Sequence, residues 1–184
     1  ARHNLNYWRF GDYLGLGAGA HSKISLLDAS ISDSCYGVHR ERKHRSPDKY
    51  MREESRVAGV KKLSSEELVY EFMLNALRLV GGFPLSLFCE TTGLDPLVLQ
   101  DNLQRGVDLG LLLVEEVNAG GTPTADATIK WVKPSQRGMQ MLDDAIILFS
   151  PANDADGHDG LGNVDTTRDT RYIGATNTEI ISKH

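Results

Sequence analysis

The side chains best suited to chemistry lie close to the start of the chain. His3 opens the segment His3-Asn4-Leu5-Asn6-Tyr7-Trp8, in which Tyr7 and Trp8 follow the imidazole by four and five positions. An imidazole nitrogen is a good axial ligand for heme iron, and aromatic rings can lie against the face or edge of a porphyrin. The segment therefore offers a candidate heme site. The alternative is a structural histidine that packs beside aromatic residues.

A glycine-rich run follows at residues 15–21. Glycine alternates there with Leu16 and Ala18, and His21 ends the run. A period of two predicts a buried strand whose backbone another group approaches closely. That group is either a cofactor, with His21 at the mouth of its pocket, or a neighbouring strand. The spacing matches neither the dinucleotide-binding fingerprint nor a phosphate-binding loop.

A basic run, 39–45, and a helical methionine, Met73, are the remaining candidates. The cations of the run could pair with propionates or phosphates, or could form a solvated loop. Met73 falls at helical core spacing and is expected to pack in the core. The chain as a whole carries a formal charge of −5 with a pI of about 5.7, which argues against binding a polyanion through overall charge.

Cysteine usage and hydropathy predict a cytoplasmic protein. The two cysteines, Cys35 and Cys89, form no CxxC, zinc-binding or disulfide pattern. We expect no membrane span, because no apolar run reaches about 18 residues, and no signal peptide. The chain begins with Ala1 inside what resembles a functional motif, so we expect the carboxy-terminal piece of a longer protein.

Composition divides the chain into four segments. Residues 1–27 are strand-like and residues 28–62 form a basic, irregular connector with a short helix near 48–56. Residues 63–150 carry periodic apolar positions and predict a domain, whereas the polar tail 151–184 has none. Such a tail cannot bury enough surface to offset its ordering entropy, so we expect it to be disordered.

The segment 63–150 predicts helix, helix, helix, strand, turn, strand and helix. The corresponding ranges are 64–79, 85–92, 95–109, 111–117, 118–125, 129–132 and 135–149. This order is typical of a winged helix. The third helix bears three aspartates and only Arg105, which would repel phosphates and offers few groups to read bases. We therefore expect packing and no nucleic-acid binding.

Taken together, several motifs resemble the oxygen-independent coproporphyrinogen III oxidase-like radical-SAM proteins, and most closely their heme chaperone branch, HemW. The resemblance covers about residues 2–149. It is carried by His3-Asn4-x-x-Tyr7-Trp8, residues 11–22, residues 71–79 with Gly82-Phe83, Thr92-Gly93-Leu94 and Gly110-Leu111-Leu112.

The resemblance implies an α+β fold in two parts. The last strand or strands of a partial (β/α) barrel would be followed by a helical, winged-helix-like domain of the HemN carboxy-terminal type. In the family, the barrel binds a [4Fe-4S] cluster and S-adenosylmethionine through a CxxxCxxC motif. Cys35 and Cys89 do not form that motif, so no enzymatic activity is expected of this chain alone.

The resemblance also implies the site. In the chaperone branch the HNxxYW element is the proposed heme-binding motif, and it falls on His3, Asn4, Tyr7 and Trp8, with His3 as candidate iron ligand. His21 is a further pocket residue at the end of the glycine-rich run.

The leading hypothesis is a piece of a heme chaperone that delivers heme to hemoproteins. The alternative is a piece of the oxidase of porphyrin biosynthesis, and a nucleic-acid-binding winged helix is disfavoured. Expected partners are heme or porphyrin, a recipient hemoprotein and the missing amino-terminal radical-SAM barrel. An apolar strand edge within 7–27 would also favour a homodimer.

Overall fold

The protein has a mixed α and β structure, as predicted. A computed structural model describes residues 2–27, 36–52, 54–118 and 128–151, all within the compact unit Ala1–Pro151. Cys35, most of the turn 118–125 and the tail beyond Pro151 lie outside the described residues, so the predictions made for them stay predictions.

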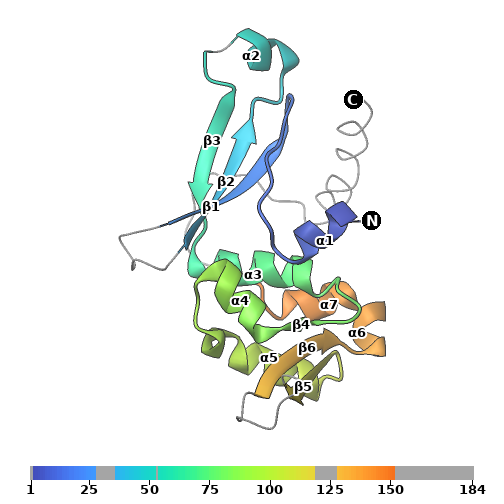
Figure 1. Cartoon of the computed structure of the whole chain (residues 1–184). Helices are drawn as coiled ribbons and strands as arrows, with labels where there is room; N and C mark the ends of the chain where they lie inside the picture. Colours follow the sequence, from blue (N-terminus) through green and yellow to red (C-terminus); the bar gives the residue numbers. More distant parts are fainter. Residues whose placement is uncertain (1, 28–35, 53, 119–127, 152–184) are drawn as a thin grey trace, which may run out of the picture. The chain divides into compact units, whose positions relative to one another are not determined.

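The amino-terminal part combines two short helices with a three-stranded antiparallel sheet (Figure 1). Its elements are α1 (Arg2–Trp8), β1 (His21–Leu27), β2 (Tyr36–Lys43), α2 (Pro47–Arg52) and β3 (Val57–Lys62), with strand order β1-β2-β3. The expectation of irregular structure is wrong for β2 and β3. These strands are rich in charge, but several of the charges have partners: Arg40 pairs with Glu71, and Lys61 with Glu67.

The first 20 residues also differ from the prediction. Residues 2–8 are helical, and most of the glycine-rich run forms a loop between Tyr13, which makes an isolated bridge to Lys23, and the start of β1. Leu14 and Leu16 are 70% and 73% exposed. The run is not a buried strand, because Gly17 and Gly19 have φ of 103° and 74°, which is incompatible with an extended chain.

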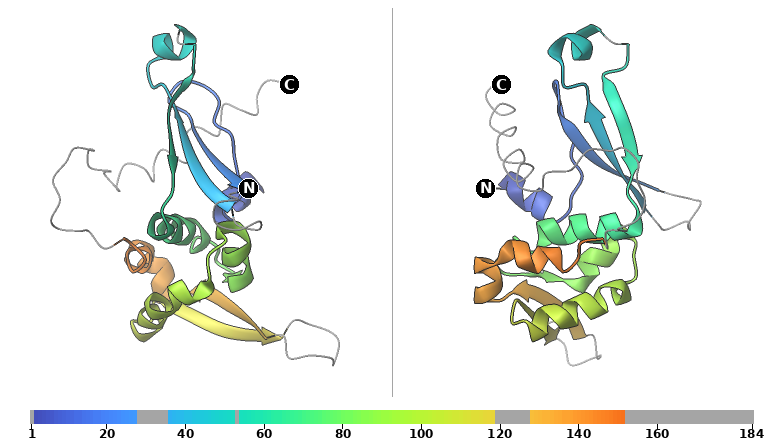
Figure 2. Two further views of the ribbon diagram at one scale, coloured as in Figure 1. Left: turned by 90° about the vertical axis from the view of Figure 1, so that its left-hand side faces the viewer. Right: turned by 180° about the vertical axis from the view of Figure 1, so that it is seen from behind.

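The segment after residue 63 follows the prediction more closely. Its helical elements are α3 (Ser65–Ala76), α4 (Leu85–Thr92), a 3-10 turn η1 (Pro96–Leu99), α5 (Gln100–Asp108), α6 (Gln136–Gln140) and α7 (Leu142–Ile147). Its strands are β4 (Phe83–Pro84), β5 (Leu112–Asn118) and β6 (Thr128–Pro134), in the order β4-β6-β5. Figure 2 shows the β5–β6 hairpin beside α5 and α6.

Helix boundaries in this segment follow local signals. Ser64 and Glu67 form a reciprocal capping box at the start of α3, and Gly93 ends α4 in the left-handed conformation. The predicted last helix is broken, because Met141 has φ −119° and ψ 49° and separates α6 from α7.

The core is centred on Phe72 of α3. Its ring meets those of Phe10, Phe83 and Phe88 edge to face, with centroids 5.5, 5.3 and 5.1 Å away. Met73 is fully buried beside it, as predicted. This core joins the chain around α1 to the helices that follow residue 63.

Candidate functional site

Helix α1 carries four of the five predicted site residues. His3 is exposed, whereas Asn4, Tyr7 and Trp8 are half-buried. Residues four apart lie on one face of a helix, so His3 shares a face with Tyr7 and Asn4 shares one with Trp8. His21 is the first residue of β1, is exposed, and lies opposite Arg42 in the sheet.

The chain just after α1 is anchored in the core. Phe10 is 2% exposed and has φ of 59°, a conformation that a non-glycine residue keeps only when its surroundings enforce it. The enforcing contacts are the Phe72 ring and the Nζ of Lys23, which donates to the Phe10 carbonyl oxygen at 2.8 Å. The Gly11 N–H also donates to the Asn6 carbonyl oxygen at 2.8 Å.

Lys23 is a buried cation with a carboxylate partner. Its side chain is 2% exposed, its Nζ lies 2.9 Å from Asp12 Oδ1, and it stands 4.0 Å above the Phe10 ring centroid. Burial lowers the pKa of Lys23 although Asp12 opposes that shift. Burial by itself would raise the pKa of Asp12, but hydrogen bonds from Lys23 and from the Ser25 N–H leave that pKa below its usual value. The pair stabilises the loop that follows α1.

The Asp12 carboxylate gives a testable pH dependence. A folded-state pKa below the unfolded value of about 3.9 stabilises the fold above that pH, and the contribution is lost as the pH falls through the folded value. Urea unfolding of the wild type and Asp12→Asn should therefore show a stability difference that is constant above about pH 5 and shrinks below about pH 4. Because the Asp12 side chain is 45% exposed, the effect is reduced by solvent screening.

Asp48 provides the control for this experiment. It is 84% exposed, and its oxygen lies 3.9 Å from Arg52. Asp48→Asn should change stability little at any pH. A difference between wild type and Asp12→Asn that stayed constant down to pH 2.5 would contradict the assignment.

A second cluster links α1 to β2 and α3. The Tyr7 and Tyr13 rings meet edge to face, with centroids 4.7 Å apart. The Tyr13 hydroxyl accepts a hydrogen bond from Arg40, whose Nε donates to Glu71 Oε2 at 2.8 Å. Burial raises the pKa of Tyr13, against the effect of the Arg40 cation. The hydroxyl is therefore protonated at neutral pH.

Tyr13 and Glu71 are not among the site residues predicted from the sequence. The role predicted for Arg40 also differs from the one that the structure shows. Arg40 was expected either to bind an anionic ligand or to lie in a solvated loop, but it pairs with Glu71, 31 residues away. Lys43 of the same run pairs with Glu41. The sequence contains one weak indication that Arg40 is not fully solvated: it lies two residues from the apolar Val38, on the same face of β2.

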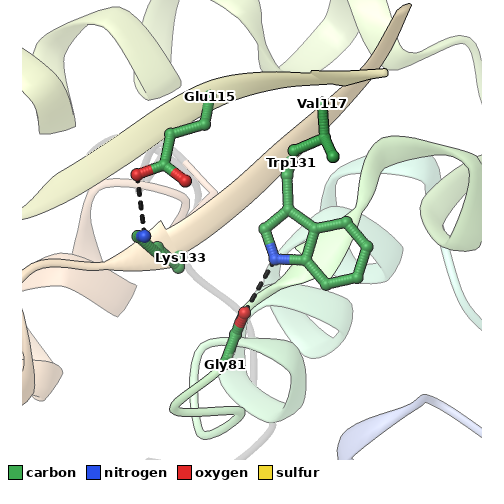
Figure 3. A pocket seen from close by; sticks show the side chains of 5 residues that line it. All are labelled: Gly81, Glu115, Val117, Trp131 and Lys133. Carbon is green, nitrogen blue, oxygen red and sulfur yellow. Dashed lines mark hydrogen bonds and ion pairs between the residues drawn. The ribbon is translucent and has the colours of Figure 1, made fainter. Parts of the chain in front are cut away.

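Two shallow pockets lie around Trp131, and none of the predicted site residues is in their lining. The first, of about 240 Å³, is lined by Gly81, Glu115, Val117, Trp131 and Lys133 (Figure 3). Trp131 Nε1–H donates to the Gly81 carbonyl oxygen at 2.7 Å, and Lys133 pairs with Glu115 at 2.7 Å. The second, of about 330 Å³, is lined by Arg9, Leu79, Gly82, Phe83, Pro84, Ser86, Leu87, Glu90 and Trp131.

The described part of the chain has neither a candidate metal cluster nor a membrane-spanning helix. No group of three or more His, Cys, Asp or Glu side chains there could hold a metal ion. Among the same residues, no helix is long and apolar enough to cross a membrane.

Comparison with known proteins identifies heme chaperones as relatives. The chain is 34% identical to the heme chaperone HemW of Escherichia coli K12 over 111 residues, which is 60% of this chain and 27% of that protein. It is 34% identical to HemW of Haemophilus influenzae over 106 residues, covering 58% of this chain and 26% of the relative. It is also 28% identical over 130 residues to the mitochondrial radical S-adenosyl methionine domain-containing protein 1 of Dictyostelium discoideum, covering 62% of this chain and 29% of that protein.

These matches confirm the predicted resemblance to HemW. The chain spans about a quarter of the length of the two HemW relatives. No family model and no solved structure matches the chain.

Proposed function

We propose, from the similarity to the HemW heme chaperones, that this chain is a portion of a protein that binds heme and delivers it to hemoproteins. The observation that carries the proposal is the arrangement of α1, where His3, Asn4, Tyr7 and Trp8 occupy two turns of one helix. Heme is the cargo in this proposal. The names of the relatives favour a chaperone over the oxidase alternative.

His3 is the proposed iron ligand. Its side chain is exposed, so a ring nitrogen is accessible to a heme that approaches from solvent, and neutral imidazole is a common axial ligand. Trp8 and Tyr7 supply aromatic surface, and Asn4 supplies an amide on the face it shares with Trp8. His21 is proposed as an outer pocket residue, on the strand that follows the glycine-rich loop.

The finer architecture also belongs to the proposal. The strand region within residues 1–27, which contains β1, would belong to a partial (β/α) barrel in the parent protein, and the elements from α3 to α7 would form the winged-helix-like domain. Asp95, which caps η1, and the two aspartates of α5 argue for packing and not for nucleic-acid binding. A [4Fe-4S] cluster and S-adenosylmethionine would belong to an amino-terminal barrel, since the only two cysteines, Cys35 and Cys89, cannot form the ligand motif.

Titration with hemin tests the proposal. The purified wild-type chain should shift the Soret absorbance of hemin, and His3→Ala should bind at least about tenfold more weakly with loss of the histidine-ligated spectrum. His44→Ala is the matched control, because His44 lies in the loop after β2 and its hydrogen bonds are made by its backbone, which accepts from the Gly19 N–H and donates to the Arg56 carbonyl oxygen. Equal spectra and affinities for wild type and His3→Ala would remove His3 from the role.

A further inference from the structure

We propose that Tyr13, Arg40 and Glu71 are positioning residues for His3. They hold the Tyr7 ring and thereby set the direction in which the His3 side chain leaves α1. The part of this inference that concerns heme rests on the proposed function. The part that concerns the helix can be measured without heme.

Helix α1 needs contacts outside itself to hold its orientation. It has seven residues and no acidic side chain in its first turn, and helices this short are marginal in water without tertiary packing. The contacts of Phe10 fix the chain just after the end of α1. They do not prevent α1 from rotating about its own axis. A contact on the side of the helix supplies that restraint.

Tyr7 makes the contact on the side of α1 that restrains its rotation. Four residues correspond to about 400° of rotation and about 6 Å of rise, so His3 lies one turn before Tyr7 and about 40° around the helix. Any rotation of α1 that moves Tyr7 off Tyr13 turns His3 by the same angle. The edge-to-face contact at 4.7 Å and 71° has a preferred geometry, so it restricts that rotation.

Tyr13 can act as a fixed support because its hydroxyl is held. The hydroxyl accepts from Arg40, and the Arg40 guanidinium lies with its centre 5.7 Å from the Tyr13 ring centroid. Arg40 also donates through Nε and a terminal nitrogen to the same oxygen of Glu71. A planar guanidinium with two such bonds has little rotational freedom.

Glu71 connects these contacts to the buried core. Glu71 precedes Phe72 and Met73 in α3, both of which are fully buried. The side chains of Arg40 and Glu71 are 25% and 20% exposed, so their pairing is less screened than a surface pair. The contacts therefore run from the core to α1 in the order Glu71, Arg40, Tyr13 and Tyr7.

The chain contains a matched control for this path. Lys61 of β3 pairs with Glu67 of α3, so this pair also joins the sheet to α3. The hydrogen bonds of Glu67 run to Lys61 and Ser64, and not to α1 or Tyr13. Glu67→Gln keeps a side chain that can complete the capping box at Ser64. An effect that came only from joining the sheet to α3 would appear in Glu67→Gln as well as in Glu71→Gln.

Hydrogen exchange in the heme-free chain tests the helix directly. Amides of residues 6–9 should exchange about tenfold faster in Glu71→Gln and Tyr13→Leu than in wild type, because a charge-assisted bond or the ring contact is lost. Tyr13→Phe keeps the ring but loses the hydroxyl, so its exchange rates should lie between those of these two variants and those of wild type. Glu67→Gln should leave these amides unchanged. Exchange in Tyr13→Leu equal to that in Glu67→Gln would overturn the proposal.

The hemin spectrum tests the consequence for the ligand. Glu71→Gln and Tyr13→Leu should lose part of the histidine-ligated Soret signature, with affinity reduced about five- to tenfold, while Glu67→Gln keeps the wild-type spectrum. Wild-type spectra and affinities in both network variants would refute the positioning of His3. If wild type itself bound hemin no better than His3→Ala, the proposed function would fail, and the exchange result would still decide whether the network orients α1.

Discussion

Replacing Phe72 with alanine is expected to lower the free energy of unfolding by about 3–5 kcal/mol. Phe72 is fully buried, and its ring meets three other aromatic rings edge to face. Truncation removes apolar burial and leaves a cavity that the three surrounding rings, from three different parts of the chain, cannot all move to fill. Urea unfolding followed by circular dichroism measures the loss as a lower midpoint with an unchanged slope.

Leu16→Ala is the control for this loss. Leu16 is 73% exposed in the glycine-rich loop, so its truncation should change stability by less than about 0.5 kcal/mol. A Phe72→Ala loss as small as that would show that the aromatic cluster is not the centre of the core.

The Phe10–Phe72 contact predicts a further result: hydrogen exchange near α1 should also increase in Phe72→Ala.

The parts of the fold that could be predicted are those whose signals are local. Ser64 and Glu67 are three residues apart and cap α3, and Pro84 and Gly93 bound α4 where the sequence places that helix. Periodic apolar positions then locate the buried face, including Met73. Each of these signals lies within one turn of the structure that it determines.

The parts that could not be predicted depend on distant residues. The left-handed Phe10 is held by Lys23, 13 residues later, and the charged strand β2 is stabilised through Arg40 and Glu71, 31 residues apart. A pattern of charges read alone predicts a solvated connector, because the partner of each charge is not visible in its neighbourhood. Alternation of glycines likewise predicts a strand, whereas positive φ at Gly17 and Gly19 produces a loop.

The conformation of the candidate site differs from the prediction. The sequence places His3, Asn4, Tyr7 and Trp8 in an extended opening segment, and the structure places them on α1. A strand would also place His3 and Tyr7 on one face, but about 13 Å apart along the chain. The helix brings them within about 6 Å of each other along its axis. That change is what allows the contact between Tyr7 and Tyr13 to influence the direction of His3.

The replacement of Gly138 by alanine should reduce stability by about 2 kcal/mol, although alanine favours helices by about 1 kcal/mol over glycine. Gly138 lies in α6, and an added Cβ would stand 1.9 Å from the Leu111 carbonyl oxygen. That oxygen accepts from the Ser135 N–H, so it cannot move without losing the bond that starts α6. Steric overlap with backbone therefore outweighs the gain in helix propensity, and urea unfolding measures the net loss.

A comparison of three glycines determines whether the overlap is the cause. An added Cβ at Gly106 would meet the flexible end of the Leu112 side chain at 2.5 Å, and one at Gly81 would meet nothing within 4 Å. Gly81→Ala should therefore stay within about 0.5 kcal/mol of wild type, and Gly106→Ala should fall between Gly81→Ala and Gly138→Ala because a side chain yields more easily than a backbone oxygen. If Gly138→Ala proved as stable as Gly81→Ala, α6 could not pack against Leu111 as closely as the structure has it.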